Sequence, residues 1–253
     1  MLKLVLMSSG EFGVRSMINR YLAGMVDHAP ETGRHGNPAD RMVSRQIEAR
    51  GIHDSRVLAA LRAVPRDLFI PESCRGDAWA DRALPIGRGQ TISQPYIVAL
   101  MTSILNPSAG DRILEVGTGS GYQAAVLASM GALVDTVEII PALAREAADR
   151  LALLGYSNVM VHTGDGSEAL SGKAPYDGIM ITCATSRIPE DLEEALVIGG
   201  RIVAPIGKSL SRQDLTVATR GPDGALTLEK ISAVVFVPMT GPRGLTSSGE
   251  ALA

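Results

Sequence analysis

The sequence predicts a doubly wound, Rossmann-like α/β fold with a terminal antiparallel hairpin, and three observations indicate it. Strand-like and helix-like segments alternate regularly from Asp111 onward. A turn with three glycines follows the first of these strands, and after residue 213 short strands are separated by the turn "GPDG". Strands that alternate with helices of about 10–15 residues form right-handed βαβ units and a parallel sheet. We therefore expect a parallel sheet with a hairpin at one edge.

The first part of the chain is expected to contain a linker followed by helices. Residues 1–26 predict a strand and a short helix, and residues 27–40 are rich in Gly, Pro and charge without periodicity, which is typical of a linker. Helices are predicted over residues 40–50 and 54–64, the second with Asp54 as its N-cap.

The stretch "GRGQTISQPY" predicts the start of a further helix. Ser93 is a favoured N-cap residue, and Pro95 is tolerated in a first turn because its missing N–H had no helical partner. Apolar residues then recur at helical spacing until Asn106. A plain helix cap leaves four residues of this stretch without a local role: Gly87, Gly89, Gln90 and Thr91.

The regular region supplies the elements of the expected sheet. Strands are predicted over residues 111–116, 132–139, 158–164, 176–182 and 199–207, and helices over residues 120–131, 141–155 and 188–196. Three more strands are predicted over residues 214–220, 226–232 and 233–239 as the antiparallel addition.

Composition narrows the class of protein. A net charge of −3 over 253 residues offers no basic stripe for a nucleic acid. Two cysteines, Cys74 and Cys183, are too few for a disulfide framework and suit a reducing cytosol. The opening "MLKLVLM" is too short for a signal sequence, and no apolar stretch approaches the roughly 20 residues of a membrane span. We expect a cytoplasmic protein without nucleic-acid or membrane partners.

The glycine-rich turn "LEVGTGSGYQ" indicates a nucleoside site. Gly117, Gly119 and Gly121 stand between a strand and a helix, where ligands approach the backbone of such sheets. A pyrophosphate fingerprint needs a third glycine at the position of Tyr122. The observed spacing, preceded by Glu115, fits a loop around a nucleoside that carries no phosphates.

Acidic residues at successive strand ends indicate a cationic cofactor. Glu115 lies in the first strand, Glu138 ends the second, and Asp165-Gly166 follows the third. A carboxylate in the position of Glu138 accepts hydrogen bonds from ribose hydroxyls, and Asp165 is placed to meet an adenine amino group. Three carboxylates disfavour an anionic ligand and suit S-adenosylmethionine, which carries a sulfonium and an ammonium group.

Several blocks of the sequence resemble, in order, the protein-L-isoaspartate O-methyltransferases. They are "MVSRQIEARGI", "ALPIGRGQTISQPYIVALMT", "ILEVGTGSGYQAAVLA", "TVEIIPALAREA", "GDGSEA", "APYDGIMITCA", "GGRIVAPIG" and "FVPMTG". The resemblance implies a class I methyltransferase sheet and divides the chain into an N-terminal extension and linker (1–40), a methyltransferase domain (41–241) and a C-terminal tail (242–253). It implies that the free carboxylate of isoaspartyl residues is methylated and then cyclises to a succinimide.

The resemblance also implies roles for individual residues. Thr91, Ile92 and Ser93 would close over the cofactor, and Ser93, as the catalytic residue, would contact the substrate carboxylate. The implied cofactor contacts are Gln90, Thr91, Ile92, Ser93, Glu115, Gly117, Gly119, Gly121, Glu138, Ile139, Asp165, Gly166 and Gln213. The implied substrate contacts are Ser93, Thr182 and Ala184. No set of residues predicts a metal site.

Elementary chemistry agrees with a site of this kind. The nucleophile is a carboxylate with a pKa of about 4, already ionised at neutral pH, so no general base is needed. The remaining tasks are alignment of the two reactants and binding of the anion.

Other functions remain open at this point. A family member could methylate an aspartate in a ribosomally made peptide to install an aspartimide. A nicotinamide dehydrogenase is disfavoured by Tyr122, and a non-catalytic binding module by the intact Ser93, Glu138 and Asp165. We expect a monomer that acts on isoaspartyl-containing proteins or peptides. Asp135 departs from the pattern, because it places a carboxylate inside a predicted strand.

Overall fold

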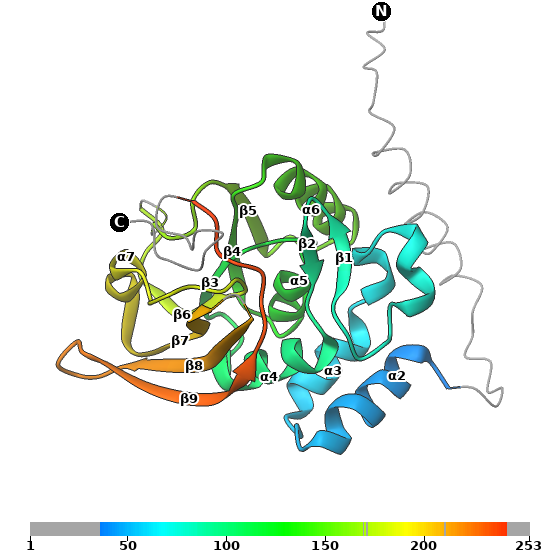
Figure 1. The fold of residues 1–253 in the computed structure, drawn as a ribbon, viewed down its shortest axis with the longest axis horizontal. Helices are drawn as coiled ribbons and strands as arrows, with labels where there is room; N and C mark the ends of the chain where they lie inside the picture. The colour runs from blue at the N-terminus through cyan, green and yellow to red at the C-terminus, as the bar shows by residue number, and fades with distance from the viewer. Residues whose placement is uncertain (1–35, 169, 171, 210, 242–253) are drawn as a thin grey trace, which may run out of the picture.

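The computed structural model describes residues 36–168, 170, 172–209 and 211–241, and a seven-stranded sheet forms its centre (Figure 1). The sheet order is β5-β4-β3-β6-β7-β8-β9. Its strands are β3 (Arg112–Val116), β4 (Leu133–Glu138), β5 (Val159–Thr163), β6 (Tyr176–Ile181), β7 (Leu196–Ser209), β8 (Arg212–Arg220) and β9 (Leu226–Val234). The first five strands in this order are parallel, whereas β8 and β9 pair antiparallel at the edge. The predicted fold is confirmed.

The order of the strands fixes where a ligand can bind. From β3 the chain moves outward through β4 to β5, then returns to place β6 on the other side of β3. The strand order therefore reverses between β3 and β6, and open α/β sheets bind ligands outside the carboxyl ends of the strands at such a point.

Helices cover both faces of the sheet. They are α2 (Pro38–Met42), α3 (Ser55–Ala63), α4 (Pro95–Leu105), α5 (Tyr122–Ser129), α6 (Pro141–Leu153) and α7 (Glu190–Glu194). Met101 of α4 and Leu127 of α5 share one buried cluster with Ile113 of β3. On the other face, Leu192 of α7 packs in a cluster with Leu114 of β3. Each face of the central strands is therefore buried, as expected for parallel strands.

The N-terminal helices follow the prediction only in part. The helix predicted over residues 40–50 is α2 continued by a π-helical turn at Val43–Ile47 and a 3₁₀ turn at Glu48–Arg50. In α3, Asp54 is the N-cap and its side chain accepts the N–H of Arg56 at 2.9 Å, as predicted. Two further 3₁₀ turns, Arg66–Phe69 and Glu72–Asp77, lead to the next strands.

The glycines of "GRGQTISQPY" belong to a hairpin that the sequence did not predict. Strands β1 (Leu84–Gly87) and β2 (Gln90–Ile92) pair with each other and with no strand of the main sheet. The two residues of the turn, Arg88 and Gly89, have φ values of +53° and +73°. Two positive φ values are typical of tight hairpin turns, which explains the glycine in the pair.

The separate third C-terminal strand predicted over residues 233–239 does not form: residues 233 and 234 end β9, and beyond Val234 the described residues form only an isolated bridge of Pro238 with Ala184. The chain leaves the sheet there because hydrogen bonds to Gln213 and Ala184 draw it across the strand ends. The side chain of Gln213 accepts the N–H of Phe236 at 2.8 Å. The backbone of Ala184 donates to Val237 at 2.8 Å, and the N–H of Met239 donates back to it at 2.7 Å. The segment consequently becomes a wall beside the carboxyl ends of the strands.

The elements expected in residues 1–26 and the tail 242–253 lie outside the described residues. Within the described part of the chain, no helix combines the length and the apolar character that crossing a membrane requires.

Candidate active site

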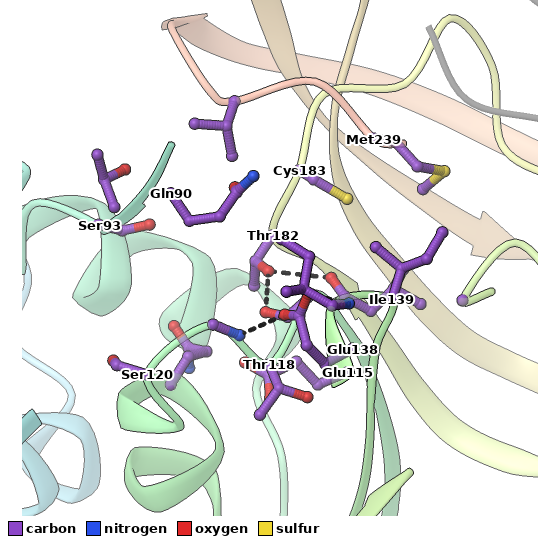
Figure 2. Close-up of a pocket in the computed structure, with 18 of the residues that line it drawn as sticks. Gln90, Ser93, Glu115, Thr118, Ser120, Glu138, Ile139, Thr182, Cys183 and Met239 are labelled. Atoms are coloured by element: carbon purple, nitrogen blue, oxygen red, sulfur yellow. Dashed lines mark hydrogen bonds between the residues drawn. The ribbon is translucent and has the colours of Figure 1, made fainter. Parts of the chain in front are cut away.

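A cleft opens at the carboxyl ends of β3, β4 and β6 (Figure 2). The hairpin strand β2, the loop before α5, the loops after β4 and β6, and the segment 237–240 contribute to its walls. Eleven of the residues predicted for the site line this cleft: Gln90, Thr91, Ile92, Ser93, Glu115, Gly117, Gly119, Glu138, Ile139, Gly166 and Thr182. The cleft therefore lies where the strand order predicts a ligand.

The loop between β3 and α5 requires glycine at its first position. Gly117 has a φ of +98°, in the left-handed region that favours glycine. A Cβ atom at this position would lie 2.5 Å from Oγ1 of Thr182. That hydroxyl donates to the carbonyl oxygens of Gly117 at 2.6 Å and Val116 at 2.9 Å (Figure 2). Thr182 thus fixes the glycine loop in addition to lining the cleft.

Glu138 is oriented by the backbone before any ligand arrives. Its Oε2 accepts the N–H of Gly119 at 2.8 Å, and its Oε1 accepts the N–H of Ile140 at 3.0 Å. The residue is buried. Each carboxylate oxygen keeps a second lone pair, so Glu138 retains the capacity to accept hydrogen bonds from two hydroxyl groups in the cleft.

Glu115 is a fully buried carboxyl group that faces the same cleft. Thr136 donates to its Oε2 at 2.5 Å, and the hydroxyls of Thr136 and Thr118 are 2.7 Å apart. Its Oε1 has no hydrogen-bond partner among the described residues. Burial raises the pKa of Glu115 to about 8, despite the hydrogen bond from Thr136. The group holds its proton at neutral pH, and a cation beside it would favour the release of that proton.

Asp165 presents a second orphaned oxygen beside the cleft. Its Oδ1 accepts the N–H of Ser167 at 2.9 Å, whereas its Oδ2 is buried without a hydrogen-bond partner among the described residues. The neighbouring Gly166 passes so close to β3 that a Cβ atom would lie 2.5 Å from Val116 Cγ1. An unpaired buried acceptor costs about 1–3 kcal/mol, which a donor on a ligand would recover.

The three acidic residues predicted at the strand ends converge in space. Burial of Cys183 raises the pKa of its thiol to about 12, and the negative charges of Glu138 and Asp165, with that of Glu115 above its own pKa, add to the shift. The thiol is therefore neutral and a poor nucleophile. A region where carboxylates gather around one point attracts a positively charged ligand.

A second cleft adjoins the first. Four residues line both clefts: Thr91, Ser93, Thr182 and Val237. The second cleft also has apolar walls from Ile97 and Phe236, and the cationic side chain of Arg212. Two ligands bound in the two clefts would thus meet at this shared boundary.

Ser93 lies at this boundary, and its predicted role as an N-cap is wrong. The N-cap of α4 is Gln94, and no side chain caps the helix. The first helical residue is Pro95, which has no N–H, and the N–H groups of Ile97 and Val98 donate to the carbonyl of Gln94 at 3.0 and 3.1 Å. The helix start therefore has no need of the hydroxyl, which stays on the side of the cleft opposite Glu138 (Figure 2).

Four residues expected at the site do not line the first cleft: Gly121, Asp165, Ala184 and Gln213. Gly121 is the N-cap of α5 with a φ of +86°. Ala184 is fully buried, and the Gln213 side chain is taken up by the backbone of Phe236 and Ser209. Ala184 and Gln213 line neither cleft. Their role is to hold in place the segment after Val234 that forms a wall of the site.

Some lining residues carried no assignment from the sequence. They are chiefly Thr118 and Ser120, Tyr122 and Gln123 at the start of α5, and the segment 237–240. The position of Thr118 and Ser120 between the glycines was an available signal. The segment 237–240 forms part of a block that carried the family resemblance, but no residue type in it indicated a role.

Comparisons with known proteins agree with this geometry. The model of the family described as protein-L-isoaspartate(D-aspartate) O-methyltransferase matches residues 37–244. The protein-L-isoaspartate O-methyltransferase of Methanospirillum hungatei is 53% identical over 205 residues, which are 81% of this chain and 94% of that protein. Protein-L-isoaspartate O-methyltransferase 1 of Rhodopseudomonas palustris is 49% identical over 82% of this chain and 85% of its own length.

Solved structures share the fold. A protein-L-isoaspartate O-methyltransferase superposes with a TM-score of 0.71 and 29% identity over 77% of this chain, and the chain spans 63% of that protein's length. A Plasmodium falciparum protein in complex with S-adenosyl-L-homocysteine gives a TM-score of 0.69 over 81% of this chain and 99% of its own, at 24% identity. Because the family model and the close relatives cover most of the chain, it belongs to the protein-L-isoaspartate(D-aspartate) O-methyltransferase family.

Proposed function

We propose that this protein transfers a methyl group from S-adenosylmethionine to the free carboxylate of L-isoaspartyl residues in damaged proteins or peptides. The ester formed then cyclises to a succinimide, which starts repair. The observation that carries this proposal is the junction of two clefts, one acidic and lined by the glycine loop, the other partly apolar, at Ser93 and Thr182.

The residues of the first cleft suit S-adenosylmethionine, whose sulfonium makes its methyl group electrophilic when it is bound. Glu138, already oriented by two N–H groups, would accept hydrogen bonds from the ribose hydroxyls. The orphaned Oδ2 of Asp165 would accept from the adenine amino group. The orphaned Oε1 of Glu115 would face positive charge. Each assignment satisfies an oxygen or a lone pair that the chain itself leaves free.

Ser93 would hold the substrate carboxylate. Its hydroxyl is not used by the helix cap, and the N–H groups of Ile97 and Val98 are engaged by the Gln94 carbonyl, so they offer the anion little. A substrate carboxylate is ionised at neutral pH, and the site needs no base. Holding one carboxylate oxygen at Ser93 aligns the other for attack, and such alignment supplies much of the rate in reactions of this kind.

The second cleft would take the peptide on either side of the isoaspartyl residue. Its apolar walls at Ile97 and Phe236 suit side chains of the substrate, and Arg212 suits an acidic one. Membership of the repair family favours this function over an aspartate methyltransferase that installs an aspartimide in a ribosomally made peptide.

Methyl transfer to a synthetic isoaspartyl peptide tests the proposal directly. The control is the same peptide with a normal aspartyl residue, and the product is followed by mass spectrometry. We expect the mass of the isoaspartyl peptide alone to rise by about 14 Da as the methyl ester forms. When the ester then cyclises it expels methanol, and the succinimide product is lighter than the original peptide by one water. Equal methylation of both peptides, or of neither, would contradict the proposed substrate.

The organisation of the protein is proposed in the same way. We propose residues 41–241 as the methyltransferase domain, with residues 1–40 and 242–253 as flanking segments. We also propose a monomer. We propose a cytoplasmic location for it, because two free cysteines suit a reducing compartment. Sedimentation of the full chain at a mass near 26.6 kDa would support the monomer.

A further inference from the structure

A row of four side chains, of which Arg66, Phe69 and Tyr122 are buried and Arg150 is partly buried, connects the two loops that meet at the active site. Arg66 and Phe69 stand three residues apart on the 3₁₀ turn Arg66–Phe69, so their side chains lie on the same side of it. The ring of Tyr122 lies between them: the Arg66 guanidinium carbon is 4.8 Å from its centroid, and the Phe69 centroid is 5.5 Å away in an edge-to-face arrangement. The Arg150 guanidinium carbon in turn is 5.9 Å from the centroid of the Phe69 ring.

Each end of this row donates to a main-chain carbonyl of the active site. At one end, Nη2 of Arg66 donates to the carbonyl of Ser93 at 2.7 Å. At the other, Nη1 of Arg150 donates to the carbonyl of Ser120, in the glycine loop, at 2.8 Å. Ser93 follows β2 and precedes the N-cap of α4, and Ser120 precedes the N-cap of α5. Both carbonyls thus lie outside regular elements, where a side-chain donor decides their position.

Core stability alone does not account for Arg66. The residue is fully buried, and none of the described carboxylates pairs with it; Asp81, which attracts it from a distance, forms its ion pair with Arg50 at 2.9 Å. Burying an unpaired cation costs several kcal/mol, and an apolar side chain of similar volume often serves a core equally well or better. What an apolar side chain cannot supply is the pair of donors that Arg66 directs at Ser93 and at the carbonyl of Ala78, 2.8 Å from Nε.

We propose that Arg66 and Arg150 are positioning residues, Arg66 for the Ser93 turn that binds substrate and Arg150 for the glycine loop that binds cofactor. We propose further that Tyr122 and Phe69, which lie between the two arginines, hold the two loops in a fixed position relative to each other. Tyr122 is well placed for this, since it begins α5 directly after the glycine loop and also lines the first cleft. The inference rests on the proposed function for its substrate half.

The experiment measures the two binding events separately in full-length variants. Calorimetric titration with S-adenosylhomocysteine gives the cofactor-site affinity without turnover, and steady-state methylation of an isoaspartyl peptide at saturating cofactor gives kcat and KM. Arg66→Met should lower peptide kcat/KM by about 10- to 100-fold, because small displacements of an aligned group have effects of this size. It should change the affinity for S-adenosylhomocysteine by less than about threefold. Arg150→Met should weaken that affinity by about tenfold, as expected for one lost hydrogen bond.

Arg112→Met is the matched control. Arg112 also stacks on a tyrosine, 5.5 Å from the Tyr176 ring, and also donates to a main-chain carbonyl, that of Lys173. It begins β3, at the amino end of the sheet away from both clefts. Arg112→Met should leave kcat, KM and the affinity for S-adenosylhomocysteine unchanged. Arg66→Lys tests geometry separately from charge. The ammonium lacks the planar fork that places Nε and Nη2 at the two carbonyls, so it should recover only part of the lost kcat/KM.

Combining the variants tests whether the row couples the positions of the two loops. If the row links the loops, the loss of peptide kcat/KM in the double variant Arg66→Met/Arg150→Met should be smaller than the product of the kcat/KM losses in the two single variants, by a factor of about three or more. Strictly multiplicative losses would overturn the link. If the wild type is active and Arg66→Met has the same peptide kinetics, the positioning role of Arg66 is overturned. The role is also overturned if Arg66→Met and Arg66→Lys lose peptide kcat/KM and affinity for S-adenosylhomocysteine equally, in proportion to their lowered melting temperatures.

Failure of the proposed function gives a different result. In that case the wild type itself does not methylate the isoaspartyl peptide. The titration of Arg150→Met against Arg112→Met with S-adenosylhomocysteine then still decides the cofactor half of the inference: a weaker affinity in Arg150→Met alone supports it, and equal affinities overturn it.

Discussion

The two walls of the active-site cleft are built on different principles. The wall that we propose for the cofactor consists of strand ends and the glycine loop, and its key atoms are fixed by short-range backbone contacts such as those of Glu138 with Gly119 and Ile140. The wall that we propose for the substrate consists of a separate hairpin, the Ser93 turn and a segment that leaves the sheet after Val234. Contacts between residues far apart in sequence hold it. The first wall follows from the fold, whereas the second is added to it.

The largest effect expected is on the cofactor wall, from Gly117→Ala. The added Cβ would lie 2.5 Å from Thr182 Oγ1 on a backbone with φ of +98°. Overpacking and backbone strain each cost about 1–3 kcal/mol. Together they predict a loss of roughly 1000-fold in affinity for S-adenosylhomocysteine, measured by calorimetry. Gly110→Ala is the control: φ is +89°, but nothing lies within 4 Å of the added atom. Equal affinities in the two variants would show that the loop tolerates a side chain.

On the substrate wall, Ser93→Ala should lower kcat/KM for the isoaspartyl peptide by roughly 100-fold, the effect of losing one preorganised donor. Because Ser93 does not cap α4, the melting temperature should stay unchanged. Ser93→Thr should retain more activity than Ser93→Ala. The control is Ser103→Ala, within α4, whose hydroxyl is buried outside both clefts. A stability loss of about 1 kcal/mol with full turnover would restore the capping role.

A moderate effect is expected from Glu138→Gln. The amide keeps the shape of the side chain but removes the charge that two N–H groups orient. Hydrogen bonds to charged groups contribute about 1.5–3 kcal/mol, so S-adenosylhomocysteine should bind at least tenfold more weakly by calorimetry. Glu229→Gln, exposed on β9, serves as the control. Unchanged affinity in Glu138→Gln would remove this residue from the site.

A last effect, on stability instead of binding or turnover, is expected in the pH dependence that Glu115 contributes. Burial raises the folded-state pKa from 4.5 to about 8. Between these values the folded protein keeps a proton that the unfolded chain releases, so stability falls as pH rises, by at most about 1.4 kcal/mol per pH unit. Denaturant unfolding between about pH 5 and pH 8 should show this slope in the wild type and less of it in Glu115→Gln. Identical slopes would mean that the carboxyl is ionised in the folded protein.

The contrast between the walls also explains what the sequence could predict. Strand and helix periodicity, the glycine spacing and the acidic strand ends are local signals, and a parallel sheet brings its carboxyl ends to one edge. Glu115, Glu138 and Asp165 therefore converge as expected. The same reasoning placed Glu115, Gly117, Gly119, Glu138 and Gly166 around the first cleft. The family resemblance, not local signals, supplied the other predicted residues that line it: Gln90, Thr91, Ile92, Ser93, Ile139 and Thr182.

Long-range contacts account for what sequence reasoning missed. Nothing local relates Arg66 to the carbonyl of Ser93, 27 positions later. The apolar run after Val234 has the pattern of a strand, but the Gln213 side chain and the backbone of Ala184 draw it off the sheet. Ser93 carries a strong capping preference, and the backbone geometry around Pro95 overrides it.

The separation of the β1–β2 hairpin from the main sheet has a kinetic consequence. Its base is anchored by the buried Leu84 and Ile92, and Ile86 reaches over the glycine loop, 3.4 Å from where a Cβ on Gly119 would lie. Its tip is tied to α6 by the ion pair of Arg88 with Glu146, whose side chains are 45% and 49% exposed. Exposed ion pairs contribute at most about 1 kcal/mol and weaken as salt screens them. Added salt should therefore hasten release of the demethylated cofactor while leaving the sheet itself untouched.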